Sequence, residues 1–371
     1  MHQRVALVHD WLEAPGGGED VLSALLELFP AAPVFTLVDF LTPSERRRLG
    51  PAAIRTSPLQ HLPGARSWFR YAAALFPSLV ERFDVSAYDV VVSVSHAVAK
   101  GVRKRAGQTH ICFCNSPARF AWAMAHTYRD RVASTPGWRA GLAERVQARF
   151  REWDLAASRD VDHFVANSNH IAAEIRRCYG RDAHVIYPPV DVARFAREAS
   201  SEREGYVTVT RFVPYKRVDL VIEAFRRLPT RRLTIVGDGP ERARLARNLP
   251  PNVALAGRLD DDATARAVGR ARAFVFAACE DFGIAPLEAQ AAGTPVIAYG
   301  RGGVGETIRG LDDARPTGVL FDEQSSDAIV DAVLRFEATT IAADDCRRNA
   351  ERFSRQRFRD EFAAHFTTIL S

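Results

Sequence analysis

Lysine is scarce in this chain: three lysines stand among 371 residues, against 47 arginines. The chain therefore uses arginine wherever a general positive charge serves. Lys216 is the one lysine in the second half of the sequence. This placement indicates a position that requires a compact ammonium group on a flexible stem, because lysine and arginine differ in geometry and hydration.

Long apolar runs are missing as well. No stretch of eighteen apolar residues occurs, so we predict no membrane-spanning helix. The N-terminal "MHQRVALVHDW" runs directly into a strand-like segment, and we therefore expect no secretory signal peptide. The five cysteines are scattered, odd in number and without the spacing of zinc ligands. That pattern favours reduced thiols and a cytoplasmic location.

The excess of positive charge lies in the first half of the chain. Residues 1–180 hold 22 basic and 17 acidic residues, a difference of +5, whereas residues 181–371 hold 28 of each. The basic clusters at 46–48 and 103–105 fit contact with anionic lipid, and they fit a solvated surface equally well. No segment resembles an RNA- or DNA-binding module, so we expect no nucleic-acid partner.

The order of the patterns predicts two domains. Short β-branched runs alternate with helical periodicity, and this alternation restarts at Tyr206 after the Pro-rich stretch 187–204, the expected interdomain linker. We therefore predict an α/β fold of two doubly wound, Rossmann-like domains with parallel sheets covered on both faces. The runs read as strands are 4–8, 34–38, 90–94, 111–114, 163–166, 206–211, 232–239, 253–257, 273–278, 295–299 and 318–321.

Doubly wound sheets bind ligands at the carboxyl ends of their strands. Gly16, Gly17 and Gly18 follow the first strand and lead into an amphipathic helix. The three glycines fit either an anion-binding site at the helix N-terminus or a plain flexible loop. His96 follows another predicted strand, where it fits either a ligand contact or a structural hydrogen bond.

Two cations follow the first strand of the second half. Arg211 closes "YVTVTR", and Lys216 comes five residues later, at the opening of the next helix. Together they would hold a diphosphate, the arginine through its fork and the lysine as a point charge. The alternative is a pair of exposed basic residues without a ligand.

The segment "FVFAACEDFGIAPLEAQAAGTPVIAYG" (274–300) reads as interior, yet it contains two glutamates. We expect Glu280 at the end of a strand, Pro286 at the first position of a helix that ends near Gly293, and Glu288 in that helix's first turn. Carboxylates accept hydrogen bonds from vicinal hydroxyls, and a helix N-terminus offers amides to phosphate. With the two cations, the segment points to a nucleotide sugar.

These residues resemble the GT-B glycosyltransferases of family 4, a large group of retaining enzymes. The E-x7-E signature is met in "EDFGIAPLEAQAAGTPVIA", the Arg…Lys pair in "RFVPYKR", the domain linker in "VIYPPVDVARF", and the last N-terminal unit in "FVANS". The resemblance covers essentially the whole chain. Within the family, "VALVHDWLEAPGGGEDVLSALLELFP" and "CNSPARFAWAMAHTY" look most like bacterial mannosyltransferases of surface-polysaccharide assembly, which use GDP-mannose.

The resemblance implies an organisation and a set of roles. Two domains would face each other across a cleft, with 1–188 on the acceptor side, 189–352 binding the nucleotide sugar, and 353–371 as a helix that packs back on the N-terminal domain. Arg211 and Lys216 would bind the diphosphate and stabilise the leaving group. Glu288 would hold the ribose, and Glu280 and His96 the transferred sugar. Backbone contacts with the donor would come from Gly16, Gly17, Gly18, Phe282, Gly283, Ile284 and Ala285, and the third glycine leaves open which one makes the contact.

The expected activity is retaining hexosyl transfer, with mannose moving from GDP-mannose to a glycan or polyprenyl-diphosphate-linked acceptor in O-antigen or exopolysaccharide biosynthesis. No cofactor and no metal are expected, because the two cations and a helix N-terminus stabilise the leaving group. The acidic runs 260–262 and 312–313 are expected to cap helices. Alternatives are a UDP-sugar donor, a GT-B nucleotide-sugar epimerase, or a non-catalytic relative that binds nucleotide sugars. Residues 66–83, basic and amphipathic, fit a helix at the inner face of the plasma membrane or a core helix.

Overall fold

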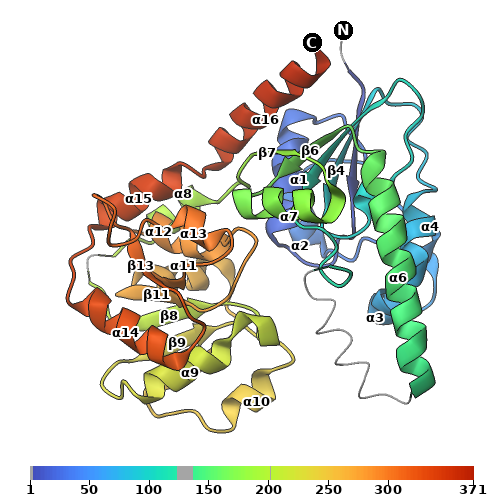
Figure 1. Ribbon diagram of the computed structural model, residues 1–371. Coiled ribbons are helices and arrows are strands. Elements are labelled where there is room, and N and C mark those ends of the chain that lie inside the picture. The colour runs from blue at the N-terminus through green and yellow to red at the C-terminus, as the bar shows by residue number, and fades with distance from the viewer. Residues whose placement is uncertain (1–2, 123–136, 201) are drawn as a thin grey trace. The chain divides into compact units, whose positions relative to one another are not determined.

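The computed structural model describes residues 3–122, 137–200 and 202–371 (Figure 1). Residues 123–128 of the segment "CNSPARFAWAMAHTY" lie outside the described residues. By its internal contacts the chain forms two compact units, Met1–Pro188 together with Arg359–Ser371, and Pro189–Phe358. No helix in the described ranges is both long and apolar enough to cross a bilayer.

The first unit contains a parallel sheet with seven strands in its described residues, in the order β3-β2-β1-β4-β5-β6-β7. The strands are β1 (Val5–His9), β2 (Val34–Thr36), β3 (Ile54–Thr56), β4 (Val90–Ser95), β5 (Thr109–Cys114), β6 (His163–Ala166) and β7 (Ala183–Val185). The α-helices are α1 (Gly17–Leu28), α2 (Pro43–Arg46), α3 (Ala65–Trp68), α4 (Phe76–Val80), α6 (Gly137–Arg159) and α7 (Asn169–Tyr179). The 3-10 helices are η1 (Arg47–Leu49), η2 (Pro58–His61), η3 (Phe69–Leu75) and η4 (Ala99–Gly101).

The second unit contains a parallel sheet with six described strands, in the order β10-β9-β8-β11-β12-β13. The strands are β8 (Tyr206–Val209), β9 (Leu233–Val236), β10 (Val253–Gly257), β11 (Ala273–Phe276), β12 (Val296–Tyr299) and β13 (Gly318–Phe321). The helices are α8 (Val192–Arg197), η5 (Pro214–Lys216), α9 (Val218–Arg226), α10 (Arg242–Ala246), α11 (Asp261–Gly269), α12 (Ile284–Ala291), α13 (Val304–Thr307), α14 (Ser326–Glu337) and α15 (Ala343–Glu351). Helix α16 (Arg355–Leu370) follows.

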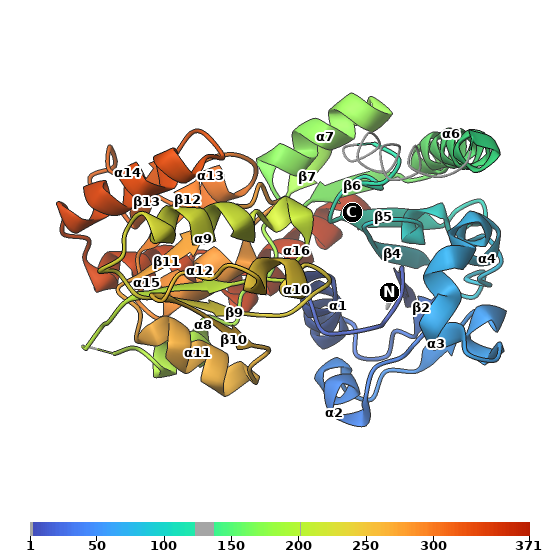
Figure 2. The same ribbon diagram turned by 90° about the horizontal axis from the view of Figure 1, so that it is seen from below.

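Helices cover both faces of the sheets, and this explains the continuous apolar strands. Every residue of β1 and of β4 is buried, as expected for strands with no solvent-facing side. In the second unit, α9 and α14 pack together over one face, where Phe225 and Phe336 contact the ring of Tyr206. Helix α8 packs with α11 and α12 on the opposite face (Figure 2). The predicted α/β class with two doubly wound sheets is confirmed.

Two strands of the first sheet were not predicted. Both β3 and β7 are three residues long, and in each the middle residue, Arg55 or His184, is exposed. Such short polar segments lack the apolar run by which a strand is recognised. All strands that were predicted are present, with shifts at their ends.

Residues 66–83 do not form one amphipathic helix. They form α3, η3 and α4 in succession, and Pro77 near the start of α4 removes an amide that a continuous helix would use. Phe69 and Phe76 belong to the core, whereas Tyr71 is 89% exposed. The prediction of a single helix over this segment is wrong, and the segment is partly core and partly surface.

The stretch 187–204 is more than a linker. The two units divide between Pro188 and Pro189, and the residues that follow form α8, which packs on α11 and α12. Asp191 caps this helix by accepting the amide of Arg194 at 3.2 Å. Most of the predicted linker is therefore an integral part of the second unit.

The end of helix α16 contributes to the first unit. The ring of Phe366 lies 4.8 Å from that of Phe29, and the rings of His184 and His365 stack at 4.2 Å. Burial, together with the charges of His184 and His163, lowers the pKa of His365 to about 4. The end of this helix therefore packs against the C-terminus of α1 and against β7.

Candidate active site

The strand order of the second unit reverses between β8 and β11. From β8 the connections lead to β9 and β10 on one side, whereas from β11 they lead to β12 and β13 on the other. Loops that diverge at such a switch point leave room for a ligand at the carboxyl ends of the strands. Lys216 lies in η5 after β8, and Glu280 lies in the loop that follows β11. The structure thus places both predicted residues at the switch point.

Lys216 and Glu280 form an ion pair, in which Nζ of the lysine donates to Oε1 of the glutamate. Their side chains are only 16% and 15% exposed. The ammonium group also lies 5.5 Å from the ring centroid of Tyr215 and 5.6 Å from that of Phe276. Partial burial makes either charge costly when it stands alone. The sequence analysis assigns the two residues to different parts of a ligand, and in the structure they pair with each other.

Arg211 is exposed, and its guanidinium makes no hydrogen bond or ion pair with any described residue. The backbone beside it is held by the turn that follows β9. Gly237 has a φ of +139°, and a Cβ there would clash with the carbonyl oxygen of Thr210. At Gly239 a Cβ would come within 2.5 Å of the carbonyl oxygen of Phe212. A Gly-Asp-Gly directly after a strand is the sequence signal for this turn, and the prediction did not include it.

The residue after Lys216 has a strained backbone. Arg217 has a φ of +51°, and it is the one non-glycine residue with positive φ in the described ranges. A non-glycine residue in the left-handed region costs about 1–3 kcal/mol. The side chain of Arg217 pairs with Asp219 at 3.3 Å. Arg217 is both the C-cap of η5 and the N-cap of α9, and its strained conformation places Lys216 at the end of η5.

Helix α12 begins two residues before Pro286, which was predicted to be its first residue. Gly283 is the N-cap, with a φ of +91°, and a Cβ there would lie 2.8 Å from Cγ2 of Val304. Glu288 therefore lies in the second turn, and its predicted place in the first turn is wrong. Gly293 ends the helix with a φ of +75°, as predicted.

The start of α12 offers backbone donors. The amides of Gly283, Ile284 and Ala285 donate to no other described residue, which is usual in the first turn of a helix. The side chain of Phe282 is buried and its ring lies 5.7 Å from that of Phe353. The Phe282 side chain is therefore part of the core, and the backbone contact of this segment with a donor stays a prediction.

Glu288 is held by an arginine that the sequence did not identify. Nη2 of Arg194 lies 3.3 Å from Oε1 of Glu288, and Nη1 lies 3.1 Å from Oδ2 of Asp261. The same guanidinium stacks 4.8 Å from the ring centroid of Phe195. Arg194 comes from α8, within the stretch that was read as a linker. No local pattern signals this contact, because 94 residues separate the partners.

Two glycines after β12 support the loop that carries Glu280. Gly302 forms an isolated β-bridge with Glu280, and the amide of Gly303 donates to the carbonyl of Glu280 at 2.8 Å. A Cβ on Gly303 would lie 2.5 Å from Cα of Phe282. Consecutive glycines after a strand were the available signal here, and the prediction missed them.

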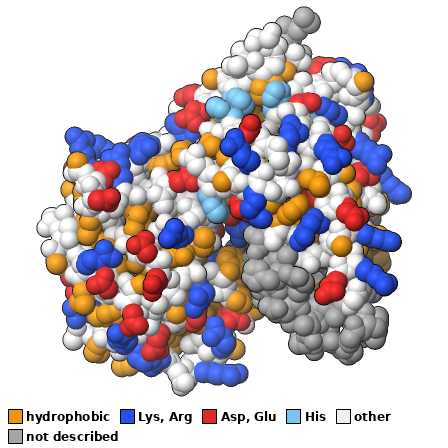
Figure 3. Space-filling model, in the orientation of Figure 1, with side chains coloured by type: hydrophobic (Ala, Val, Ile, Leu, Met, Phe, Trp, Pro, Cys, Tyr) orange, Lys and Arg blue, Asp and Glu red, His pale blue; other side chains and the backbone are white. Residues whose placement is uncertain are grey.

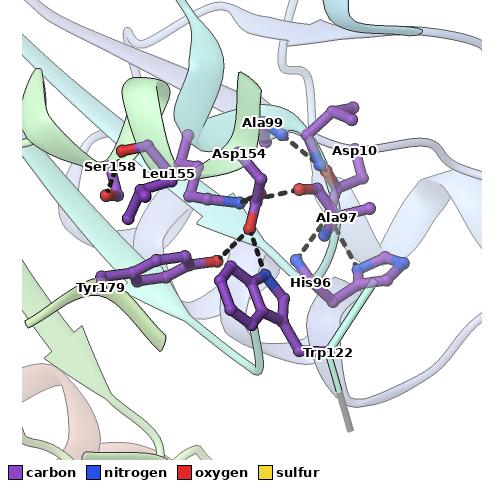
Figure 4. Close-up of polar contacts among 11 residues, drawn as sticks. Asp10, His96, Ala97, Ala99, Trp122, Asp154, Leu155, Ser158 and Tyr179 are labelled. Atoms are coloured by element: carbon purple, nitrogen blue, oxygen red, sulfur yellow. Dashed lines mark hydrogen bonds and ion pairs between the residues drawn. The ribbon is translucent and has the colours of Figure 1, made fainter. Parts of the chain in front are cut away.

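The first unit has a switch point of its own, between β1 and β4. Asp10 follows β1 and His96 follows β4, and Oδ2 of Asp10 lies 2.9 Å from Nδ1 of His96 (Figure 4). The buried carboxylate also accepts the amides of His96 at 2.6 Å, Ala97 at 3.0 Å, Val98 at 2.6 Å and Ala99 at 2.6 Å. Asp10 was not predicted as a site residue.

These contacts decide the protonation of the pair. Burial by itself would raise the pKa of the Asp10 carboxyl, but the charge and hydrogen bonds of His96 lower that pKa well below its ordinary value. Burial would likewise lower the pKa of His96, but the charge and hydrogen bond of Asp10 raise it above 6.5. Each group therefore favours the charged form of the other.

The three glycines form the start of α1. Gly16 is the N-cap, and Gly17 and Gly18 are the first helical residues, whose amides donate to no other described residue. A Cβ at Gly18 would lie 3.3 Å from Cε1 of His9, and Nε2 of His9 lies 3.4 Å from Oε1 of Glu19. The helix N-terminus that was predicted is present, and the alternative of a flexible loop is wrong.

The acidic runs behave differently from each other. Asp260 caps α11 by accepting the amide of Ala263 at 2.7 Å, as predicted. Asp313 instead accepts the amide of Arg315 at 2.8 Å inside a turn, and β13 follows. The predicted capping role of 312–313 is wrong. Within the described ranges, no group of three or more His, Cys, Asp and Glu side chains is placed to hold a metal ion.

The switch point of the second unit thus combines an uncommitted arginine, a lysine paired with a carboxylate, unpaired helix amides and a second carboxylate. Cations and amides suit phosphoryl oxygens, and carboxylates suit vicinal hydroxyls. One edge of a sheet can therefore recognise both ends of a nucleotide sugar.

Comparison with known proteins also points to enzymes that use nucleotide sugars, the glycosyltransferases. The model of "Glycosyltransferase Family 4" matches residues 15–194, and that of "Glycosyl transferases group 1" matches residues 190–353. The chain is 32% identical over 230 residues to the D-inositol 3-phosphate glycosyltransferase of Rhodococcus jostii, covering 53% of this chain and 50% of that protein. It is 32% identical over 242 residues to the GDP-mannose-dependent alpha-(1-6)-phosphatidylinositol monomannoside mannosyltransferase of Mycolicibacterium smegmatis, covering 55% and 60%.

The chain therefore spans about half the length of the curated relatives it matches. Among solved structures, HepE of Anabaena in complex with UDP and glucose aligns with a TM-score of 0.71 and 15% identity, over 99% of this chain and 100% of that chain. At this identity the likeness concerns the fold. Since the two family models follow each other along nearly the whole sequence, the chain belongs to the family 4 glycosyltransferases of GT-B fold.

Proposed function

We propose that the chain is a retaining hexosyltransferase that moves mannose from GDP-mannose to a lipid-linked or glycan acceptor in O-antigen or exopolysaccharide biosynthesis. The observation that carries the proposal is the pair of Lys216 and Glu280 at the switch point, beside the unpaired amides of α12. The choice of GDP-mannose is supported by the relatives that are named as GDP-mannose-dependent mannosyltransferases.

The proposed chemistry uses the charges of the second unit. As the bond between the sugar and the diphosphate breaks, negative charge grows on the leaving nucleotide, and Arg211, Lys216 and the α12 amides stabilise it. If the Lys216 ammonium moves from Glu280 to the diphosphate, the Glu280 carboxylate becomes available to accept hydrogen bonds from the sugar hydroxyls. Glu288, oriented by Arg194, is assigned to the ribose. Because the cations supply the electrostatic stabilisation, the proposal includes no metal and no cofactor.

The donor is tested by thermal denaturation with GDP, UDP, GMP and GDP-mannose. A ligand that binds the folded form alone stabilises it by about 2.7 kcal/mol at a hundredfold excess over its dissociation constant. We expect GDP and GDP-mannose to raise the Tm more than UDP does. A preference for UDP would contradict the mannosyl assignment and would leave family membership intact.

The reaction class is tested by following nucleotide release from GDP-mannose with an extract of lipid-linked glycans as acceptor. A transferase releases GDP in proportion to glycosylated acceptor. An epimerase would consume the nucleotide sugar without releasing nucleotide, and a non-catalytic relative would bind the donor and leave it unchanged. Either of these two results would contradict transferase activity.

We also propose that the protein works in the cytoplasm, at the inner face of the plasma membrane. Leu62, Tyr71 and Leu75 are 48%, 89% and 58% exposed, and Arg66 and Arg70 lie among them in the same segment. Elsewhere, on the face shown in Figure 3, basic and acidic side chains are interspersed. Exposed aromatic and aliphatic groups beside arginines suit an anionic lipid surface.

Flotation with phosphatidylglycerol vesicles tests this contact. We expect part of the protein to float with the vesicles, and the double variant Tyr71→Ser, Leu75→Ser to stay in solution while it keeps its affinity for GDP. If the unchanged protein stays entirely in solution, the membrane proposal is wrong and the donor assignment is unaffected.

A further inference from the structure

Asp10 and His96 are 86 residues apart in sequence and meet at the carboxyl edge of the first sheet. The carboxylate of Asp10 only accepts hydrogen bonds when ionised, so the imidazole nitrogen that faces it, Nδ1, carries a proton. The other ring nitrogen, Nε2, has no partner among the described residues, and the His96 side chain is 36% exposed. Nε2 is therefore the ring atom that is left for a ligand.

The orientation of the ring is fixed from two further sides. The indole of Trp11 meets the His96 ring edge to face, with centroids 4.6 Å apart and planes at 82°. The amide of His96 itself donates to the same Asp10 oxygen that Nδ1 faces, at 2.6 Å. The side chain and the backbone of His96 thus converge on one oxygen of Asp10. These contacts restrict both the rotation of the imidazole ring and the backbone conformation of His96.

The far side of the same turn is anchored by a buried ion pair (Figure 4). Nζ of Lys100 donates to Oδ1 of Asp154 and to the carbonyl of Ala97, the latter at 2.9 Å. Oδ2 of Asp154 accepts Nε1 of Trp122 and the hydroxyl of Tyr179, each at 2.7 Å. The two charged side chains are 1% and 0% exposed. Lys100, held by Asp154 of α6, thereby binds the turn at the carbonyl of Ala97, while Asp10 binds it at its amides.

We propose that Asp10 is a positioning residue for His96: it keeps Nδ1 protonated in both charge states of the ring, so that in the charged imidazolium Nε2 donates a hydrogen bond to an oxygen of the bound nucleotide sugar. The inference rests on the proposed function, because it takes the nucleotide sugar as the ligand of His96. If Asp10 served only to cap the turn, accepting the four amides would be enough for that role. Its contact with Nδ1 of His96 would then have no purpose.

The charges around His96 favour its protonated form. Asp10 and Glu19 raise the pKa of His96, whereas burial and Arg119 lower it, and the net direction is upward from 6.5. Among the described residues the ring of His9 also lies near, with its centroid 6.4 Å from that of His96. Protonated His96 donates a hydrogen bond through Nε2, and Nε2 loses this proton as the pH rises through the raised pKa of His96. The rate of transfer should therefore fall on the alkaline side of 6.5.

Nitrogen-15 NMR of histidine-labelled protein tests the positioning without any reaction. His96 is assigned by the loss of its signals in His96→Gln. We expect Nδ1 to stay protonated at every pH and Nε2 to titrate with a pKa above 6.5, and we expect Asp10→Asn to lower that pKa. A neutral His96 with its proton on Nε2 would overturn the proposal. This result is decisive even if Asp10→Asn does not fold, because it comes from the unchanged protein.

Kinetics separate positioning from capping. Asp10→Asn should lower kcat by about 10- to 100-fold, the order of loss expected when a contact group is misplaced by an ångström, with the KM for the donor nearly unchanged. It should also shift the alkaline limb of the pH profile to lower pH. In the His96→Gln background, Asp10→Asn should cost little further rate. Equal losses of kcat in both backgrounds, or an unmoved limb, would show a merely structural cap.

The two proposals fail in distinguishable ways. If no donor and acceptor pair gives transfer, the proposed function is wrong, while the NMR result still decides the tautomer of His96. If transfer occurs and Asp10→Asn leaves both the tautomer and the pH profile unchanged, the inference about Asp10 is wrong and the proposed function stands.

Discussion

The ammonium group of Lys216 donates to the carboxylate of Glu280 across 64 residues of sequence. Each residue comes from the loop after one of two adjacent parallel strands, so the pair exists only because β8 and β11 are neighbours. In this pair two partly buried charges of opposite sign compensate each other. In the proposed function, a diphosphate competes for the lysine, and sugar hydroxyls replace the lysine at the glutamate.

Lys216→Met removes the ammonium group and keeps the length of the side chain. We expect the affinity for GDP to fall by about 10- to 100-fold, since a charge-assisted hydrogen bond contributes about 1.5–3 kcal/mol. Isothermal titration calorimetry measures the change. Lys104→Met is the matched control, because Lys104 pairs with Asp162 on the surface of the first unit. Equal GDP affinity of the two variants would remove Lys216 from the diphosphate site.

Glu280→Gln tests whether Glu280 contacts the sugar or the nucleotide part of the donor. The variant keeps the shape of the side chain, and without its anionic partner Lys216 is free for phosphate. We therefore expect GDP to bind at least as tightly as before, whereas GDP-mannose loses its advantage over GDP and kcat falls by about 100-fold. Competition binding and initial rates measure the two effects. A parallel loss of affinity for GDP and GDP-mannose would contradict a role at the sugar.

Lys100→Met breaks the buried pair with Asp154 and leaves that carboxylate without its cation. Removal of one partner of a buried ion pair costs about 3–5 kcal/mol. Urea-induced unfolding of the variant should show this loss. Lys104→Met again serves as the control, with an expected cost of about 0–1 kcal/mol, because its pair is partly exposed. Similar midpoints for both variants would mean that Lys100 is dispensable for the first unit.

Gly237→Ala tests the turn that holds the backbone of Arg211. The φ of +139° and the clash with the carbonyl of Thr210 predict a loss of at least about 1–3 kcal/mol, together with weaker GDP binding. Gly141→Ala is the matched control in α6, where a Cβ meets nothing within 4 Å. That change should stabilise by about 0.5–1 kcal/mol. Unfolding curves in which both variants gain stability would refute the close approach.

His110 makes the first unit sensitive to acid. Burial, with a further contribution from Lys104, lowers the pKa of His110 from 6.5 to about 3. In the unfolded chain this histidine takes up a proton below pH 6.5, and in the folded chain it does so only near pH 3. Stability should therefore fall as the pH falls through that window, by up to about 1.4 kcal/mol per pH unit.

The variant His110→Leu checks this sign. Its free energy of unfolding, measured by urea at pH values from 7 to 4, should have a shallower slope than that of the unchanged protein, whatever its absolute stability. Replacement of the exposed His61 by Gln should leave the slope as it is. An identical slope in His110→Leu would assign the acid sensitivity to other groups.

Much of the site could be predicted because its residues follow strands. The patterns located the strand before His96, the strand before Lys216 and the E-x7-E segment, and parallel topology brings such positions to one edge. The ends of elements were predicted less well. Helix α12 starts at Ile284 because Gly283 adopts a positive φ against Val304, and that contact belongs to another segment.

The sequence by itself determined the alternation of apolar strands and amphipathic helices, and with it the two parallel sheets and their ligand-binding edges. Those features depend on local periodicity and on burial of both sheet faces. Only the tertiary structure decided that Lys216 pairs with Glu280, that Arg194 reaches Glu288, and that Asp10 faces His96. Each of these contacts joins side chains from separate loops, and their free energy depends on distance and burial, which become defined once the chain has folded.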